Sequence, residues 1–316
     1  MRKELPQTYI YNQDHSVVVR ARSQQGEMTE RKIGAEDLIL DLNYTDQQGT
    51  PKKGRVVLKP VAAQVSGLDL PSEEDLRILY MAAANCYSGV SDEELLGKAA
   101  SVPEEEAESF LRRNIIATGH YSVLEHAKAT FLVSGVSRAC THQLVRHRLA
   151  SFSQQSQRYV SPNLSEEEEV AFPFIIPPEF RVDERFLSQY LSGIGRAVSG
   201  YYSLKEGGAF PEDARMLLPN AAASRIAISG NLRVWMELIP KRTCARAQWE
   251  VDMMATEIAR QLWQAIPVVF EKIGPPCSRS GCDQGKRSCG VALKQPLSAF
   301  FDQEKYPHDR LIFGMR

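Results

Sequence analysis

Residues 146–159, which read RHRLASFSQQSQRY, concentrate the side chains of this chain that are best suited to binding an anion. The stretch contains no Asp or Glu, and its basic residues are Arg146, His147, Arg148 and Arg158. A solvated helix face usually alternates cations with carboxylates, because opposite charges four residues apart stabilise the helix. Arginines flanking a histidine can instead grip phosphate oxygens in bidentate fashion. The stretch therefore predicts a local site for an anionic ligand.

The uncharged residues between these cations suit the remainder of a nucleotide. Serine hydroxyls add hydrogen-bond donors without a repelling charge, and glutamine amides pair a donor with an acceptor, as the amide edge of a base does. These residues are Ser151, Ser153, Gln154, Gln155, Ser156 and Gln157. Phosphate and base recognition together favour a nucleotide site over the alternative, a solvated basic surface.

The bulk composition places this site in a nearly neutral protein. The chain has 316 residues, a formal net charge of -1 and 43% hydrophobic residues. Dedicated nucleic-acid or membrane-surface proteins are usually basic overall, so neither class is expected. No apolar run is long enough to span a bilayer and the N-terminus has no apolar signal region, so we expect a cytoplasmic protein. In that compartment the six cysteines are not expected to form disulfides.

The pattern along the chain changes from strand-like to helical near residue 70. Short strands and turns are expected in the first seventy residues, where SVVVRA and GRVVLKP alternate as strands do. Ser72 with Asp75, and Ser101 with Glu104, have the spacing of capping boxes, which predicts that a helix begins at each.

Hydrophobic spacing identifies further elements around the basic stretch. AKATFLVSGV predicts a strand, and a short helix from about Ser137 leads into the basic stretch. Helical spacing predicts two long helices, marked first by Phe186, Tyr190, Ile194 and Val198, and later by Val251, Met254, Ala255, Ile258 and Leu262. The chain as a whole indicates an α+β fold with more helix than strand.

The basic stretch resembles the signature of the flavin-dependent thymidylate synthases, which is R-H-R, two residues, S, four residues, S, one residue, R. The matching positions are Arg146, His147, Arg148, Ser151, Ser156 and Arg158. The resemblance covers roughly residues 73–273 and implies a central, mostly antiparallel sheet with flanking long helices. It divides the chain into an N-terminal extension (1–70), a catalytic domain (71–274) and a Cys-containing tail (275–316).

That resemblance implies a reaction. Members of the family convert dUMP to dTMP, with methylenetetrahydrofolate as one-carbon donor, FAD as hydride carrier and NADPH as reductant. They are homotetramers with shared active sites, so dTMP biosynthesis by a small-molecule enzyme is expected, without nucleic acid or membrane partners. No cysteine nucleophile is needed, so Cys140 and Cys244 are not expected to be catalytic. Ser156 is expected to bind and not to attack, because no motif supplies it with a general base.

The resemblance also assigns residues to the flavin. TGHYSVLEHAKATF is similar to the family segment G-H-x-[ST]-x-x-E-H, and GNLRVW is similar to a second flavin-binding segment. The residues implied for FAD are His120, Ser122, Glu125, Arg146, His147, Arg148, Asn231 and Arg233.

The remaining assignments concern dUMP. DARMLLP is similar to the segment that supplies an arginine to the nucleotide, and PKRTCARAQWE carries the arginine that lies against the pyrimidine. The residues implied for dUMP are Gln143, Arg146, Gln154, Gln155, Ser156, Gln157, Arg158, Arg215 and Arg242. Arg242 is the implied catalytic residue, because a fixed guanidinium beside uracil stabilises the anion that makes C5 nucleophilic.

Two features depart from the family pattern. Glu237 and Arg246 stand where other residue types are common, and a pairing between them is one expectation. The tail carries Cys277, Cys282 and Cys289, which suggest zinc ligation, but a closed zinc site needs a fourth ligand. His308 or another subunit could supply the fourth ligand. Without that ligand we expect free thiols and no bound metal.

Other classes of function stay open at this point. A nucleic-acid-binding protein with a zinc module is disfavoured by the neutral charge and the lack of interleaved aromatics. A family member that modifies another pyrimidine nucleotide or uses another one-carbon donor would keep the same nucleotide and flavin residues. A nucleotide sensor without turnover is the third alternative, and the presence of Arg242 beside the full signature counts against it.

Overall fold

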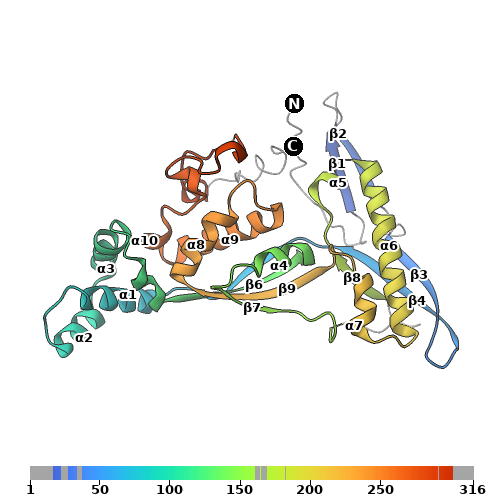
Figure 1. The fold of residues 1–316 in the computed structure, drawn as a ribbon, viewed down its shortest axis with the longest axis horizontal. Helices are drawn as coiled ribbons and strands as arrows, with labels where there is room; N and C mark the ends of the chain where they lie inside the picture. The colour runs from blue at the N-terminus through green and yellow to red at the C-terminus, as the bar shows by residue number, and fades with distance from the viewer. Residues whose placement is uncertain are drawn as a thin grey trace. The chain divides into compact units, whose positions relative to one another are not determined.

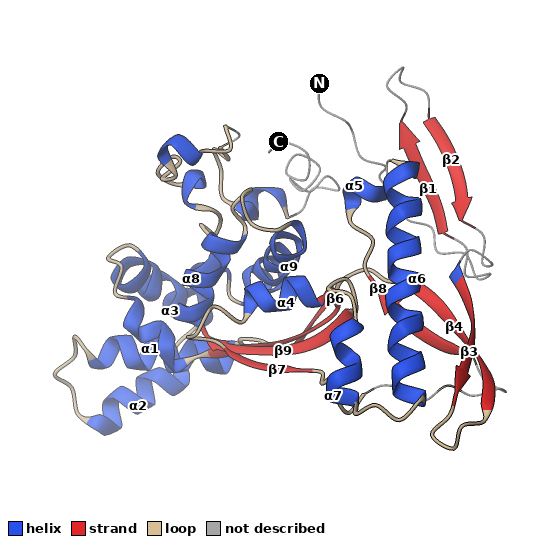
Figure 2. Cartoon of the chain, turned by 45° about the vertical axis from the view of Figure 1, so that its right-hand side comes forward, coloured by secondary structure: helices blue, strands red, loops and turns tan. Residues whose placement is uncertain are grey.

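The computed structural model describes residues 17–22, 28–33, 38–160, 164, 169–181, 183–290 and 292–301. Two compact units are present, and each is assembled from separated segments of the chain (Figures 1 and 2). Unit 1 contains residues 1–63, 134–141 and 154–225, and unit 2 contains residues 64–133, 142–153 and 226–316. The division at residues 70 and 274 that the sequence suggested stays a prediction.

Unit 1 is a small sheet packed against one long helix. Strand β3 (Ile39–Thr45) pairs antiparallel with β4 (Pro51–Pro60), and β4 pairs parallel with β8 (Val170–Phe174). Helix α6 (Glu184–Glu206) begins at the N-cap Asp183 and buries Ile194, Val198, Tyr201 and Tyr202 in the same hydrophobic core as these strands. The other elements are the antiparallel pair β1 (Val17–Arg22) and β2 (Met28–Ile33), α5 (Pro178–Arg181), α7 (Pro211–Ala214) and a 3-10 turn at Arg215–Leu217.

Unit 2 is mainly helical. Its helices are α1 (Glu73–Asn85), α2 (Asp92–Ser101), α3 (Glu104–Leu111), α8 (Leu232–Arg242), α9 (Trp249–Ala265) and α10 (Pro267–Phe270), with a π-helical turn at Arg112–Ile116 and a 3-10 turn at Tyr121–His126. The core of this unit contains Trp235, which stacks edge-on against Phe131 at 5.1 Å. The indole N–H of Trp235 donates to the Gly230 carbonyl at 3.0 Å, so the buried polar atom is satisfied.

A four-stranded sheet has the order β5-β6-β9-β7, with β5 (Gln64–Asp69) in unit 2. Strands β6 (Lys128–Ser137), β7 (Ser151–Gln154) and β9 (Ala223–Asn231), like helix α4 (Arg138–Leu144), have residues in both units. Helices α8 and α9 lie over one face of the part of this sheet that belongs to unit 2 (Figure 1).

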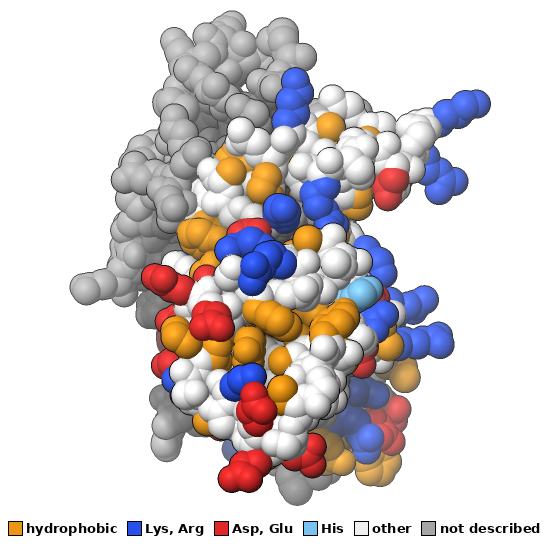
Figure 3. Space-filling view, turned by 90° about the vertical axis from the view of Figure 1, so that its left-hand side faces the viewer, with side chains coloured by type: hydrophobic (Ala, Val, Ile, Leu, Met, Phe, Trp, Pro, Cys, Tyr) orange, Lys and Arg blue, Asp and Glu red, His pale blue; other side chains and the backbone are white. Residues whose placement is uncertain are grey.

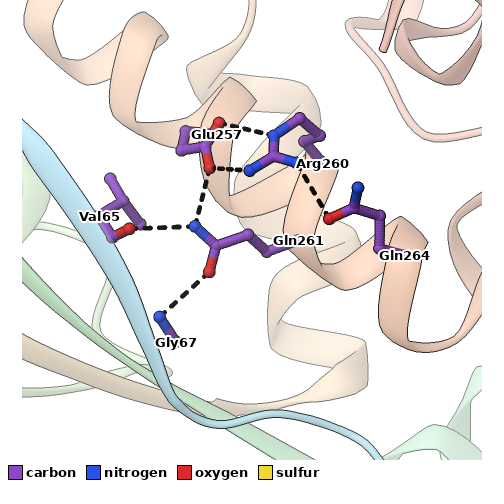
Figure 4. Close-up of polar contacts among 6 residues, drawn as sticks. All are labelled: Val65, Gly67, Glu257, Arg260, Gln261 and Gln264. Atoms are coloured by element: carbon purple, nitrogen blue, oxygen red, sulfur yellow. Dashed lines mark hydrogen bonds and ion pairs between the residues drawn. The ribbon is translucent and has the colours of Figure 1, made fainter. Parts of the chain in front are cut away.

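Helix α9 is fastened to the edge strand β5 by one glutamine (Figure 4). The Gln261 side chain donates to the Val65 carbonyl and accepts from the Gly67 backbone N–H, both at 3.0 Å. Glu257 accepts a second hydrogen bond from Gln261 at 2.8 Å and fixes the orientation of its amide. An edge strand exposes unpaired backbone groups, and Gln261 satisfies two of them.

The structure confirms the α+β fold and most of the predicted helices. The Ser72 side chain accepts from the Asp75 backbone N–H, and the Asp75 carboxylate accepts from the Ser72 backbone N–H, as in a capping box. The capping box predicted at Ser101 is wrong, because Ser101 is the last residue of α2 and its hydroxyl donates to the Gly97 carbonyl at 2.8 Å. Helix α3 instead follows Pro103, which has no side-chain cap.

Figure 3 shows the end of unit 2 that carries α1–α3, where hydrophobic side chains lie exposed among charged ones. Leu96 on α2 and Tyr87 after α1 are among the exposed large side chains. Single exposed apolar residues are common on protein surfaces. Every helix in the described part of the chain is too short or too polar to cross a membrane.

Gly135 in β6 provides a test of packing in unit 1. Its φ of +67° is the left-handed region, and an added Cβ would lie 2.1 Å from the Ala62 carbonyl oxygen. We expect Gly135→Ala to lower the free energy of unfolding by about 2–4 kcal/mol, since both backbone strain and a clash are introduced. Urea denaturation measures this, with Gly193→Ala in α6 as the control, because nothing lies within 4 Å of its added Cβ. Equal stability of the two variants would show that the Gly135 contact is absent.

Candidate functional site

Unit 1 brings together two of the arginines predicted to bind the nucleotide. Arg158 Nη2 lies 3.1 Å from Glu212 Oε2, and Arg215 Nε donates to the Glu212 backbone carbonyl at 3.2 Å. The Ser156 hydroxyl accepts from the Arg158 backbone N–H at 3.1 Å and fixes the turn that carries this arginine. The sequence expectation of uncompensated charge is therefore corrected for Arg158, because a carboxylate distant in sequence pairs with it.

A third arginine belongs to this group and was missed from the sequence. Arg138 is the first residue of α4, and the pKa of its guanidinium is lowered, mainly by burial and secondly by the charge of Arg215. Among the described residues, no carboxylate forms an ion pair with Arg138 or Arg215. Two neighbouring unpaired cations attract an anion. No motif surrounds Arg138, so only its tertiary position identifies it.

The glutamines and serine of the basic stretch border a cavity in unit 1. The cavity has a volume of about 160 Å³ and is lined by Gln155, Ser156 and Gln157, with Tyr201 and Ser224 on its other walls. The Gln155 backbone N–H donates to the Arg225 carbonyl at 2.8 Å, which ties the basic stretch to β9. These three side chains therefore stand at a recess, as a nucleotide-binding role requires.

Gln154 differs from its neighbours, because its side-chain amide is hydrogen-bonded to buried residues of unit 1. Its Nε2 donates to the hydroxyls of Thr141 at 2.8 Å and Ser224 at 2.9 Å, and both hydroxyl residues are buried. Both amide hydrogens are thus committed, and only the carbonyl oxygen is left for a ligand.

Unit 2 holds Arg242 next to Gln143, which lies three residues before the basic stretch. Arg242 is the last residue of α8, and its Nη2 donates to the Gln143 backbone carbonyl at 3.3 Å. Helix α8 begins at Asn231, whose side-chain oxygen accepts from the Val234 backbone N–H at 2.9 Å. The Arg242 Nε is buried and has no hydrogen-bond partner in the described structure. Buried donors are rarely left unpaired, so this atom is suited to a ligand.

His147 is close to Arg242 and is not a cation at neutral pH. Its pKa is lowered from the ordinary value of 6.5, first by burial and then by the charges of Lys241 and Arg242, with Glu237 acting in the opposite direction. Its Nε2 is also buried without a partner among the described residues. The basic stretch therefore presents three cations and one neutral imidazole, where the sequence suggested four cations.

The lowered pKa of His147 predicts its titration. We expect the NMR resonance that disappears in His147→Gln to titrate below pH 6.5, because the folded protein disfavours the charged imidazole. Since the unfolded chain then takes up the proton first, the contribution of His147 to stability is present above pH 6.5 and decreases as the pH falls below it. Titration of that resonance at or above pH 6.5 would contradict the buried, cation-flanked position.

The 3-10 turn Tyr121–His126 and α8 meet through an ion-pair network. Arg233 pairs with Glu125 through Nη1 and with Glu237 through Nε, the latter at 3.5 Å. The expected pairing of Glu237 with Arg246 is wrong, because the Arg246 guanidinium donates to the Arg287 carbonyl instead. Helical spacing explains the difference, since Arg233 and Glu237 are four residues apart on one helix.

The other predicted flavin residues lie on exposed parts of unit 2. His120 Nδ1 is 2.7 Å from the Tyr87 hydroxyl, which orients the ring. Ser122 is exposed in the same 3-10 turn, and Arg146 and Arg148 are exposed after α4. Within the described ranges no carboxylate forms an ion pair with either of these two arginines, so both are available to an anionic ligand.

An α+β fold whose unit 1 groups Arg138, Arg158 and Arg215, and whose unit 2 exposes two arginines beside a half-buried histidine, is suited to binding phosphorylated ligands. Residues 70–268 match the family described as thymidylate synthase complementing protein. The chain is 39% identical to the flavin-dependent thymidylate synthase of Geobacter sulfurreducens over 214 residues, 68% of this chain and 88% of that protein. It is 36% identical to that of Clostridium tetani, over 69% of this chain and 90% of the relative. The chain therefore belongs to the family of the flavin-dependent thymidylate synthases.

Solved structures show the same fold. The chain is similar to a UMP/dUMP methylase, PolB from Streptomyces cacaoi bound with 5-Br dUMP, with a TM-score of 0.54 and 21% identity. The similarity covers 68% of this chain and 95% of that one. A second structure of the same protein, bound with 5-Br UMP, gives a TM-score of 0.51.

Proposed function

We propose that this chain catalyses the reductive methylation of dUMP to dTMP, with methylenetetrahydrofolate as the one-carbon donor and NADPH as reductant. One observation carries the proposal beyond family membership. Arg242, the residue expected beside the pyrimidine, is anchored to the Gln143 carbonyl and keeps a buried Nε without a partner. The chain thus holds a cationic donor in place for a group that the described residues do not supply.

The role of Arg242 is electrostatic. Uracil C5 attacks an electrophile only weakly, and its nucleophilicity rises when negative charge on the ring's amide edge is stabilised. A guanidinium fixed before the reaction stabilises that charge without reorganisation cost. The bond between Arg242 and the Gln143 carbonyl supplies this preorganisation.

No cysteine is assigned the role of nucleophile. Cys140 is fully buried in α4, where solvent and substrate cannot reach its thiol. Cys244 lines a small cavity with three cysteines of the tail and is therefore oriented towards the tail. Arg242 activation of uracil makes a covalent cysteine adduct unnecessary in the proposed reaction.

The arginines of unit 1 are proposed to hold the phosphate and sugar of dUMP. Arg158 and Arg215 gather around Glu212, and Arg138 adds its charge beside Arg215. A dianionic phosphate pairs with guanidinium groups through charge-assisted hydrogen bonds. Ser156 and the neighbouring glutamines border the recess and are proposed to bind the sugar and base.

The residues of unit 2 fit a flavin. Exposed Arg146 and Arg148 suit its phosphates, and neutral His147 with an unpartnered buried Nε2 suits a polar ring atom. Arg233 is held in place by Glu125 and Glu237, so it presents an ordered guanidinium. FAD, when bound, supplies hydride transfer between NADPH and the one-carbon unit, which no amino-acid side chain provides. A homotetramer with shared active sites is part of the same proposal.

The proposal is tested by anaerobic spectroscopy of the flavin-loaded protein. NADPH is added first to bleach the flavin, and dUMP and methylenetetrahydrofolate are then added singly and together. Reoxidation only when both are present is the expected result, because the electrons then have an acceptor. UMP in place of dUMP is the parallel sample. If the flavin is reoxidised with UMP but not with dUMP, the substrate is UMP. If it is reoxidised with neither nucleotide, the proposed reaction is wrong.

A further inference from the structure

Four of the six cysteines line one small cavity in unit 2. Cys244 follows α8, and the others come from the tail at Cys277, Cys282 and Cys289. The cavity has a volume of about 20 Å³, close to that of a single ion or water molecule. Its wall also includes Arg246, whose guanidinium donates to the Arg287 carbonyl and so ties the loop after α8 to the tail.

We propose that Cys244, Cys277, Cys282 and Cys289 form a structural zinc site with four thiolate ligands. The three tail cysteines lacked a fourth ligand in the sequence, and the structure supplies Cys244. His308, which the sequence offered for that role, lies outside the described residues. Four thiolates select soft or borderline metals, and a closed tetrahedral set is the usual structural zinc site. The cavity is large enough for one ion.

The thiols share the cavity but are not yet at ligand distance. Among the described residues, no group of three or more Cys, His, Asp or Glu side chains converges closely enough to hold a metal ion. A change of one cysteine rotamer moves its sulfur by about 3 Å, so side-chain rotation alone changes the distances between the sulfur atoms. Gly281 and Gly290, with φ of +85° and +72°, adjoin Cys282 and Cys289 outside the helices and strands, and glycine is the residue with the widest choice of backbone conformation.

The surroundings of Cys277 include a backbone donor suited to a metal-bound thiolate. The backbone N–H of Leu293 is hydrogen-bonded to Cys277, as is common for metal-bound thiolates. Zinc binding releases four thiol protons and leaves a net charge of -2 on the complex. Arg246, which lines the cavity, offsets part of this charge.

The site would fix the tail against the end of α8. Cys244 lies two residues after Arg242, so a metal at Cys244 restrains the segment that follows the proposed catalytic arginine. The family match ends at residue 268, and the three tail cysteines lie beyond it. The zinc site is therefore an addition to the family domain, and its existence does not depend on the proposed reaction.

Metal analysis of the full chain tests the proposal. The protein is produced in zinc-supplemented medium, purified without chelator and measured by inductively coupled plasma mass spectrometry. One zinc per chain is expected, and Cys244→Ser and Cys282→Ser should each lose most of it. Cys86→Ser is the matched control and should retain full zinc, because Cys86 is exposed and lies outside the cavity.

A second measurement on the unmodified chain guards against variants that fail to fold. Treatment with a mercury reagent that blocks thiols should release one zinc per chain, with four thiols modified in step with that release. Absence of zinc, iron with labile sulfide in its place, disulfides among these cysteines, or equal loss of zinc in Cys86→Ser would each overturn the proposal.

Discussion

Replacing Arg242 with Ala is expected to lower the turnover of dUMP by about 10²- to 10³-fold, the usual cost of removing one preorganised charge-stabilising donor. The reason is that the guanidinium anchored on the Gln143 carbonyl is the group proposed to stabilise charge on uracil. Steady-state dTMP formation measures the loss, and flavin absorbance shows whether the cofactor is still bound. Arg242→Lys should recover only part of the rate, because one ammonium replaces a planar fork of donors.

Arg113→Ala is the matched control for this change. Arg113 is an exposed arginine of unit 2, and its Nε donates to the Ser109 carbonyl on its own helical segment. Its removal should leave turnover within about twofold of the parent, as expected for a surface substitution. An Arg242→Ala variant that binds flavin and turns over at the rate of Arg113→Ala would refute the proposed role of Arg242.

Replacing Arg158 with Ala is expected to raise the KM for dUMP by about 10- to 100-fold, with a smaller change in kcat. A hydrogen bond to a charged group contributes about 1.5–3 kcal/mol, and each 1.4 kcal/mol is a tenfold change in affinity. The Arg158 side chain is 46% exposed, which favours the lower part of the range. Initial rates over a dUMP series separate KM from kcat.

Deoxyuridine, which has no phosphate, gives the sharper comparison. The parent and Arg158→Ala should process deoxyuridine at similar low rates, because the proposed partner of Arg158 is then missing. Arg196→Ala in α6 is the control, because it also removes one positive charge. Among the contacts described, the Arg196 side chain is hydrogen-bonded only to Ser192. A loss of activity of equal size on dUMP and deoxyuridine would show that Arg158 does not bind the phosphate.

Local patterns in the sequence were enough to predict much of the fold. Spacing of apolar residues marked α6 and α9, and the Ser72 capping box marked the start of α1, because these signals act within a few turns of chain. The box at Ser101 failed for a physical reason. The same hydroxyl that caps one helix can bond the carbonyl four residues earlier, and a helix already in place decides between them.

The candidate site was only partly accessible from the sequence. The signature located the arginines, yet the pairing of Arg158 with Glu212 and the closeness of Arg138 to Arg215 join segments far apart in the chain. The state of His147 also depends on burial, which spacing does not report. Cys244 was not expected to be catalytic because the resembled family needs no cysteine nucleophile; that it shares a cavity with three tail cysteines is a result of the fold.

The most direct test of the central claim is mass spectrometry of the nucleotide after anaerobic incubation of the purified protein with FAD, NADPH, methylenetetrahydrofolate and dUMP. We expect dTMP, formed only when all four components are present and lost in Arg242→Ala. If the flavin is bound and reduced while dUMP returns unchanged, the chain does not catalyse this methylation and the central claim is wrong.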